Sequence, residues 1–369
     1  MPNLIIAPKG LEGVVVTKTS ISKIDGEKGR LTYRGYEIAD LAEKLTFEET
    51  AYLLWYGSRP STRELSRFRG DLVSGQSLPA RTQEFIKRAP AKTNPLVLLR
   101  TMTSLIGMGE KDETAPLESA KKLLPKFPMI LSSFNCHRKH REFVRPSKNL
   151  SFSDNYLLML TGKVPRKELS SALNSYLILL ADHGLNSSTF SAIVTISTLT
   201  DYYSAITSAI GTLKGPLHGG APSQVWQMLE EIGEKSRAEK WLKDRVETGG
   251  RIMGFGHRIY RTQDPRSKVL KNLAKRIARP EIFELADFVE TRARELLHEK
   301  HPERVLDTNV EFYSSLVLNA VGIPADMFTA TFACSRLVGW TAHILEQLSD
   351  NRLFRPESEY VGPENLTLT

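Results

Sequence analysis

Residues 327–345 read MFTATFACSRLVGWTAHIL, and this stretch decides the fold class. Its apolar residues lie on nearly every side of a helix, which predicts a helix that is buried all round. The stretch from Phe190 to Leu213 has the same character. Helices of this kind form the middle of a large helical domain or of a dimer interface. We therefore predict a mostly α-helical protein.

Helical patterns also dominate the chain outside these two stretches. Thr46 and Glu49 have the spacing of a capping box ahead of an apolar run, and Gly57 supplies a stop signal. From Ile282 to Leu297, apolar residues recur on one face, and charged residues such as Glu290 fall elsewhere. This period predicts an amphipathic helix on the surface.

The first forty residues differ from the rest of the chain. Val14–Thr17 and Leu31–Tyr33 are β-prone, and the turn-forming residues Asp25, Gly26 and Gly29 lie between them. We predict a small β-hairpin region near the N-terminus.

Composition and charge narrow the class of partner. The chain has 369 residues, 41% of them apolar, and 50 basic residues against 42 acidic ones give a net charge of +8. That charge favours anionic partners. The basic residues are scattered and are not interleaved with aromatic residues, which argues against a nucleic-acid interface. A polyanionic small molecule is the partner that we expect.

Cysteine usage and hydropathy bear on the compartment. Cys136 and Cys334 lie far apart and form no CxxC motif, so neither a zinc site nor a disulfide framework is indicated. The opening stretch MPNLIIAPKG lacks the pattern of a secretory signal. No run approaches the roughly 18 apolar residues of a membrane span. We predict a soluble, cytoplasmic protein.

Three of the eight histidines stand in unusual local settings. His183 lies in ADHGLNSST, His218 in GPLHGG and His257 in GFGHRIY. Glycines beside a histidine let backbone and imidazole approach a ligand closely, and imidazole can donate or accept a hydrogen bond near neutral pH. Any one of these pairs could be a simple loop residue, but three together favour a site. No histidine pair has metal-ligand spacing of the HExxH kind, so no metal is predicted.

Arginine occurs where a helix should be apolar. Arg336 lies inside the apolar stretch at residues 327–345. An unpaired buried guanidinium there would cost several kcal/mol. Two interpretations are open: an internal acidic partner, or a substrate carboxylate bound by the planar guanidinium. Arg266, after Asp264-Pro265, and Arg355 raise the same question, although a solvated charge is a stronger alternative on a loop.

Taken together, these motifs resemble citrate synthase in its shorter bacterial and archaeal form. The similarity covers essentially the whole chain, from residues 10–14 (GLEGV) through the histidine motifs to NVEFY at 309–313 and YVGP at 360–363. It implies a mostly α, two-domain helical fold and a homodimer. The large domain would comprise residues 1–219 and 318–369, and the small domain residues 220–317.

The resemblance also assigns chemistry to single residues. It implies that His218 donates a hydrogen bond to the thioester carbonyl of acetyl-CoA, and that His257 binds and polarises the ketone of oxaloacetate. Arg261 matches a position that contacts CoA phosphate. Further ligands of the oxaloacetate carboxylates would be His183, Arg266, Arg336 and, from the other subunit, Arg355. Acetyl-CoA would be a substrate, and no cofactor or metal is implied.

Glu311 departs from the family pattern. The catalytic base of the family is typically an aspartate in Asn-Val-Asp, whereas this chain has Asn309-Val310-Glu311. The extra methylene moves the carboxylate by up to about 1.5 Å on a fixed backbone. We predict that the local backbone compensates for it. Two alternatives stay open: a 2-methylcitrate synthase that uses propionyl-CoA, and a non-catalytic regulator that binds CoA or dicarboxylates.

Overall fold

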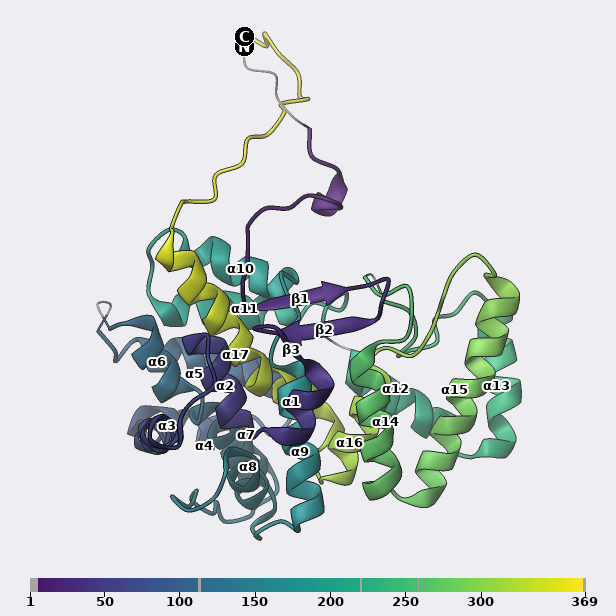
Figure 1. Ribbon diagram of the computed structural model, residues 1–369, viewed down its shortest axis with the longest axis horizontal. Helices are drawn as coiled ribbons and strands as arrows, with labels where there is room; N and C mark the ends of the chain where they lie inside the picture. Colours follow the sequence, from purple (N-terminus) through teal and green to yellow (C-terminus); the bar gives the residue numbers. More distant parts are fainter. Residues whose placement is uncertain (1–5, 112–113, 220, 258, 368–369) are drawn as a thin grey trace.

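Helix α17 (Phe328–Ser349) runs through the middle of the molecule, as its apolar sequence predicts (Figure 1). Every residue from 330 to 344 is buried. It contacts α2 (Phe47–Tyr56), α9 (Lys167–Leu180) and α10 (Ser187–Ile196), among others. The mostly α fold is therefore confirmed.

The computed structural model describes residues 6–111, 114–219, 221–257 and 259–367. Gly220 and Arg258, which belong to the histidine motifs, lie outside the described residues. The remaining helices around α17 are α1 (Ile38–Lys44), α3 (Thr62–Ser74), α4 (Ala80–Arg88), α5 (Pro95–Gly107), α6 (Pro116–Leu123), α7 (Lys126–Arg138), α8 (Phe152–Thr161) and α11 (Tyr202–Leu213), with short 3-10 turns η1 (Lys9–Leu11) and η2 (Ala325–Met327). No helix in the described ranges is long and apolar enough to cross a membrane.

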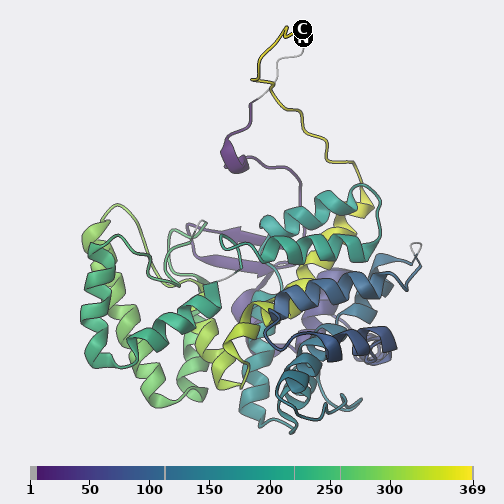
Figure 2. The same cartoon turned by 180° about the vertical axis from the view of Figure 1, so that it is seen from behind.

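A second group of helices gathers at one side of the molecule (Figures 1 and 2). It consists of α12 (Ala221–Ile232), α13 (Lys235–Glu247), α14 (Pro265–Ile277) and α15 (Pro280–Lys300). Helix α16 (Val310–Ala320) contacts α12 and α14 in this group and α9 in the larger one. The predicted boundary near residue 317 falls inside α16, and the division into two domains stays a prediction.

The long apolar stretch at 190–213 is not one helix, and this prediction was wrong. Leu199 adopts a positive φ of 63° after α10 ends. The side chain of Asp201 then accepts a hydrogen bond from the Ser204 N–H at 3.0 Å and starts α11. Full burial was wrong as well, because Phe190 and Val194 are only half-buried. Helices α10 and α11 lie side by side at the edge of the helical group (Figure 1).

The N-terminal hairpin is confirmed, with a shift of its first strand. The antiparallel sheet has the order β1 (Ser22–Asp25), β2 (Arg30–Tyr33) and β3 (Tyr36–Glu37). The segment 14–17, which we expected to be the first strand, lies before the sheet, and Val15 is 86% exposed. It forms no strand because Ser22–Asp25 occupies the position opposite β2.

The capping predictions hold, and one burial prediction does not. In α2, the Thr46 hydroxyl accepts from the Glu49 N–H, the Glu49 carboxylate accepts from the Thr46 N–H, and Gly57 ends the helix in the left-handed region. The amphipathic helix at 282–297 is confirmed within α15. Glu290, however, is not on the outer face: only 2% of it is exposed.

Candidate active site

His183 and His257 meet although they come from separate loops. Their ring centroids are 5.3 Å apart, and the Nε2 atom of His183 lies 3.2 Å from the Tyr260 hydroxyl. His183 follows α9, and the other two residues lie in the loop between α13 and α14. Burial, with the nearby Arg266, holds the pKa of His183 well below its usual value. His183 is therefore uncharged at neutral pH.

His257 is held in one tautomer by its own loop. Its Nδ1 atom accepts hydrogen bonds from the backbone N–H groups of Ile259 at 2.9 Å and Tyr260 at 3.2 Å. The ring proton of the neutral imidazole is therefore on Nε2. Burial, together with the charge of Arg266, lowers the pKa of His257 to about 4. At neutral pH, Nε2–H is a donor without a positive charge.

His218 has the opposite tautomer. The backbone N–H of Ser188 points at its Nε2 atom at 3.3 Å, and the Ser188 hydroxyl lies 2.8 Å from the same atom. Because Nε2 accepts, the ring proton is on Nδ1. Trp340 Nε1 on α17 donates to the Ser188 hydroxyl at 3.1 Å and holds it in place. Burial, with Arg336 nearby, lowers the pKa of His218 to about 4.

Arg266 has an internal acidic partner. Its Nε and Nη2 atoms donate to the two carboxylate oxygens of Asp264 at 3.0 and 2.8 Å, and both side chains are buried. Asp264 also accepts from the Arg266 N–H, at the start of α14. Arg266 therefore makes an internal ion pair, and its binding of a ligand carboxylate stays a prediction. Its Nη1 atom has no hydrogen-bond partner among the described residues.

Arg336 lacks such a partner. Its Nε atom donates to the Leu180 carbonyl at 2.8 Å, and its guanidinium lies 4.5 Å from the centre of the Phe332 ring. No carboxylate of the described ranges lies within 4 Å of its nitrogen atoms, although only 2% of the residue is exposed. Asp182 contributes attraction from farther away. A buried guanidinium of this kind is suited to a ligand carboxylate.

Glu311 lies in the first turn of α16 and faces the same two arginines. Asn309 accepts from the Glu311 N–H at 3.0 Å and donates to the Gly256 carbonyl at 3.0 Å, which joins this turn to the loop of His257. The Glu311 Oε2 atom is inaccessible to solvent and has no hydrogen-bond partner in the described part of the chain. Burial raises the pKa of Glu311 to about 7, although Arg266 and Arg336 oppose this.

These residues therefore occupy one neighbourhood. The charge of Arg336 acts on the pKa of His183, His218 and Glu311, and Arg266 acts on His183, His257 and Glu311. Direct contacts join His183 to His257, the Glu311 turn to the loop of His257, and His218 through Ser188 to Trp340 on α17. Their individual chemical roles stay predictions.

Two predicted binding residues lie apart from this neighbourhood. Arg261 is exposed, although it follows Tyr260 on the loop of His257. Arg355 is exposed on the extended segment beyond α17, which projects away from the helices (Figure 1). Sequence reasoning missed the contacts made by Ser188, Tyr260 and Asn309. All three residues lie inside the quoted motifs. The sequence therefore located them near the site, but it did not indicate which side chain or backbone group each one contacts.

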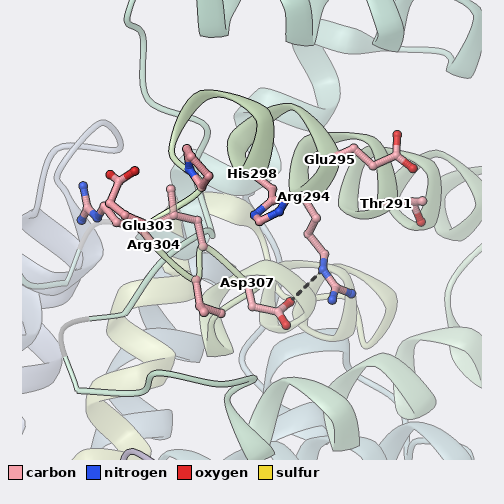
Figure 3. A pocket seen from close by; sticks show the side chains of 10 residues that line it. Thr291, Arg294, Glu295, His298, Glu303, Arg304 and Asp307 are labelled. Atoms are coloured by element: carbon pink, nitrogen blue, oxygen red, sulfur yellow. Dashed lines mark ion pairs between the residues drawn. The ribbon is translucent and has the colours of Figure 1, made fainter.

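A groove of about 480 Å³ lies at the end of α15 and along residues 302–307 (Figure 3). Arg294 and Asp307 pair across it at 3.3 Å, and His298 and Arg304 also line it. None of the predicted catalytic or binding residues lines this groove. Among the described residues, no group of three His, Cys, Asp or Glu side chains could hold a metal ion.

The hairpin turn contacts the loop that carries His257. The Arg261 N–H donates to the Gly26 carbonyl at 3.0 Å, and a Cβ atom added at Gly26 would collide with the carbonyl oxygen of Ile259. At the other end of the hairpin, Ser22 donates to Asp182 at 2.5 Å, next to His183. The hairpin therefore supports two of the histidine loops.

This contact predicts that Gly26→Ala displaces the His257 loop. A shift near 1 Å in an active site can cost roughly a hundredfold in rate, so we expect kcat/KM to fall by about ten- to a hundredfold, measured by steady-state kinetics. Gly70→Ala is the control, because Gly70 lies in helix α3 with nothing within 4 Å of an added Cβ atom. Unchanged kinetics in the Gly26 variant would show that the loop tolerates the added methyl group.

Comparison with known proteins identifies the family. A family model described as citrate synthase, C-terminal domain, matches residues 10–357. Citrate synthase 2 of Bacillus subtilis is 42% identical, over 97% of this chain and 96% of that protein. The 2-methylcitrate synthase of Shewanella oneidensis is 36% identical, over 96% and 94%.

A solved structure agrees with these matches. It is the ternary complex of carboxymethyl coenzyme A and oxaloacetate with citrate synthase from the archaeon Thermoplasma acidophilum. It matches with a TM-score of 0.91 and 32% identity, and the match covers 98% of this chain and 97% of that one. Since both the sequence and the fold match over nearly the whole length, the chain belongs to the citrate synthase family.

Proposed function

We propose that this protein condenses the methyl group of acetyl-CoA with the ketone of oxaloacetate and, with water, releases citrate and CoA. The observation that carries the proposal is the grouping of uncharged imidazole donors, a carboxyl of raised pKa and a buried arginine without a carboxylate partner. The relative from Thermoplasma acidophilum was solved with oxaloacetate and a CoA analogue, which supports the choice of substrates.

The first step is removal of a methyl proton. Glu311, as the carboxylate, takes the proton, and the C–H electron pair moves into the bond to the thioester carbon. His218 donates from Nδ1 to the thioester oxygen as negative charge develops there. Fixed donors in a water-poor site stabilise such an oxyanion better than water does. The product of this step is the enol or enolate.

Carbon–carbon bond formation follows. The enol carbon attacks the ketone carbon of oxaloacetate, and the C=O electron pair moves to the ketone oxygen, which accepts a hydrogen bond from His257 Nε2–H. This oxygen takes up a proton and becomes the hydroxyl of the product, which balances the proton that Glu311 removed, so Glu311 ends as the carboxylate and His257 as the neutral imidazole. Arg336 and Arg266 hold the carboxylates, with His183 as a further ligand. Water then hydrolyses the thioester, so that CoA leaves as the thiol. Closure of the two proposed domains would exclude water before this last step.

The second candidate is a 2-methylcitrate synthase, which the match to the Shewanella oneidensis protein supports. One methylene in an apolar pocket is worth only about 1 to 3 kcal/mol of discrimination. The test is thiol release from purified protein with oxaloacetate and either acetyl-CoA or propionyl-CoA. We expect the larger kcat/KM with acetyl-CoA; the reverse ratio would assign the second function. Turnover with neither would reject both, and binding without turnover would indicate a regulator.

The raised pKa of Glu311 predicts the pH dependence. The base must be ionised, so kcat/KM should rise about tenfold per pH unit below pH 7 and level off above it. His218 and His257, with pKa values of about 4, stay uncharged across this range. The profile is measured between pH 5 and 8 in buffers of constant ionic strength. A flat profile would contradict the assignment of Glu311 as the base.

The proposed location is the cytoplasm, and the proposed assembly is a homodimer in which Arg355 enters the site of the partner. Phe354 packs its ring against Phe190 at 5.9 Å, and Asn351 donates to the Ser197 carbonyl at 3.1 Å. The extended segment therefore leaves the molecule across α10, whose outer residues are half-buried. These features support an interface at α10 and α11.

Subunit mixing tests the shared site. The variants Arg355→Leu and Glu311→Gln should each be nearly inactive. If the two residues serve one site from different subunits, random pairing of the two variants puts both lesions in one site of each mixed dimer and leaves the other intact. We then expect activity to return to roughly one quarter of that of the unmodified dimer. No recovery in co-expressed, mass-verified mixed dimers would place Arg355 in its own subunit's site, and a fully active Arg355→Leu variant would show that Arg355 serves no site.

A further inference from the structure

Glu290 is a carboxylate in the middle of a helix that should expose it. It lies on α15, yet it is 2% exposed, and its carboxylate oxygens accept hydrogen bonds from three side chains of the described residues. Oε2 accepts from the Tyr313 hydroxyl at 2.5 Å and from Lys271 Nζ at 2.5 Å. Oε1 accepts from the Thr308 hydroxyl at 2.9 Å. A buried carboxylate with three donors is costly to disrupt.

Two of these donors flank Glu311. Thr308 is three residues before it, and Tyr313 is two residues after it, in the first turn of α16. One carboxylate from a different helix therefore holds both sides of the turn that carries Glu311. Among the described residues, the hydrogen-bond partners of the Glu290 side chain are Lys271, Thr308 and Tyr313, so Glu290 acts on the site through the turn and not directly.

The hydrogen-bond cluster around Glu290 also includes Ser267, the residue that follows Arg266. The Ser267 hydroxyl donates to the Thr308 hydroxyl at 3.2 Å, and both residues are buried. Lys271, one turn later on α14, donates to Glu290 directly. The cluster thus joins the Glu311 turn to the helix whose first turn holds Arg266.

We infer that Glu290 is a positioning residue that sets where the Glu311 carboxylate lies relative to Arg266. The inference rests on the proposed function of Glu311 as the base. Glu311 has one more rotatable bond than the aspartate that is usual in the family, so its backbone has to be placed accurately for proton transfer. A displacement near 1 Å can cost roughly a hundredfold in rate.

The test is Glu290→Gln, which keeps the size of the side chain. The substitution removes the negative charge opposite Lys271 and replaces one acceptor oxygen by an NH2 group, so the donors around it have to rearrange and the Glu311 turn should shift. We expect kcat to fall by about ten- to a hundredfold, with KM for oxaloacetate within about twofold. Tyr313→Phe removes one donor and keeps the ring, and should lower kcat in the same direction by a smaller factor.

Glu295→Gln is the matched control. Glu295 lies on the same helix, its side chain is 54% exposed and its partner is Arg292, so kcat should not change. Thermal unfolding of all three variants checks that they are folded. If Glu290→Gln and Tyr313→Phe melt at lower temperature but keep the kcat of the unmodified protein, Glu290 has only a structural role and the inference is overturned.

A readout without turnover separates this inference from the proposed function. The carboxyl carbon of Glu311 is followed by 13C NMR in Glu-labelled protein and assigned by its absence in Glu311→Gln. Its titration should move in Glu290→Gln and stay unchanged in Glu295→Gln, because its distance to Arg266 changes. An unchanged titration overturns the positioning inference. Absent turnover of the unmodified protein, together with a moved titration, overturns only the proposed function.

Discussion

Replacing Glu311 with glutamine is expected to lower kcat by about 10²- to 10⁴-fold, the usual contribution of a general base. The amide has the same size and shape but cannot take a proton at neutral pH. Binding of oxaloacetate should change little, because Arg336, Arg266 and the imidazoles stay in place. Steady-state thiol release measures the first quantity, and calorimetry measures the second. Retained turnover in a preparation verified by mass spectrometry would reject Glu311 as the base.

Glu311→Asp tests whether the backbone has adapted to the longer side chain. If it has, aspartate places the carboxylate up to about 1.5 Å short of the methyl group, and kcat should fall by roughly a hundredfold. The affinity for oxaloacetate should again stay nearly constant. A variant faster than the unmodified protein would show that glutamate is poorly placed for acetyl-CoA and that a different acyl-CoA is the better substrate.

Arg336→Leu is expected to separate substrate binding from stability. Loss of one charge from a buried, hydrogen-bonded charge pair costs about 2 to 5 kcal/mol, so KM for oxaloacetate should rise by at least about thirtyfold. Within the part of the chain that the structure describes, the close partners of the guanidinium are the Leu180 carbonyl and the Phe332 ring. Its removal should therefore leave the melting temperature unchanged or raise it.

The measurement for this prediction is thermal unfolding with and without oxaloacetate. Binding to the folded state raises the melting temperature of the unmodified protein in proportion to ligand affinity, and this increase should vanish in Arg336→Leu. Arg138→Leu is a control on the larger helical group, since Arg138 pairs with Asp326 away from the site. If oxaloacetate still stabilises Arg336→Leu fully, Arg336 is not a carboxylate ligand.

Local features of the fold could be predicted from the sequence because their partners are close along the chain. The capping box of Thr46 and Glu49 spans three residues, and the all-round apolar character of α17 is a property of one segment. The failures have two different causes. The break near Leu199 depends on a single backbone angle, and the burial of Glu290 depends on donors from α14 and the Glu311 turn.

The sequence by itself determined the helical class, the family resemblance and the chemical groups available for catalysis. Only the tertiary structure decided the state of those groups: the proton of His257 on Nε2, the proton of His218 on Nδ1, and the pairing of Arg266 with Asp264 while Arg336 has no carboxylate nearby. For His218 and Arg336, the physical reason is distance along the chain. The hydrogen-bond partners of His257 and Arg266 lie within three positions, but the burial that makes these contacts hold depends on the packing of distant elements. Helix formation depends on neighbours within about four residues, whereas Arg336 meets the Leu180 carbonyl across 156 positions. Burial and hydrogen-bond partners of that kind exist only after the helices have packed.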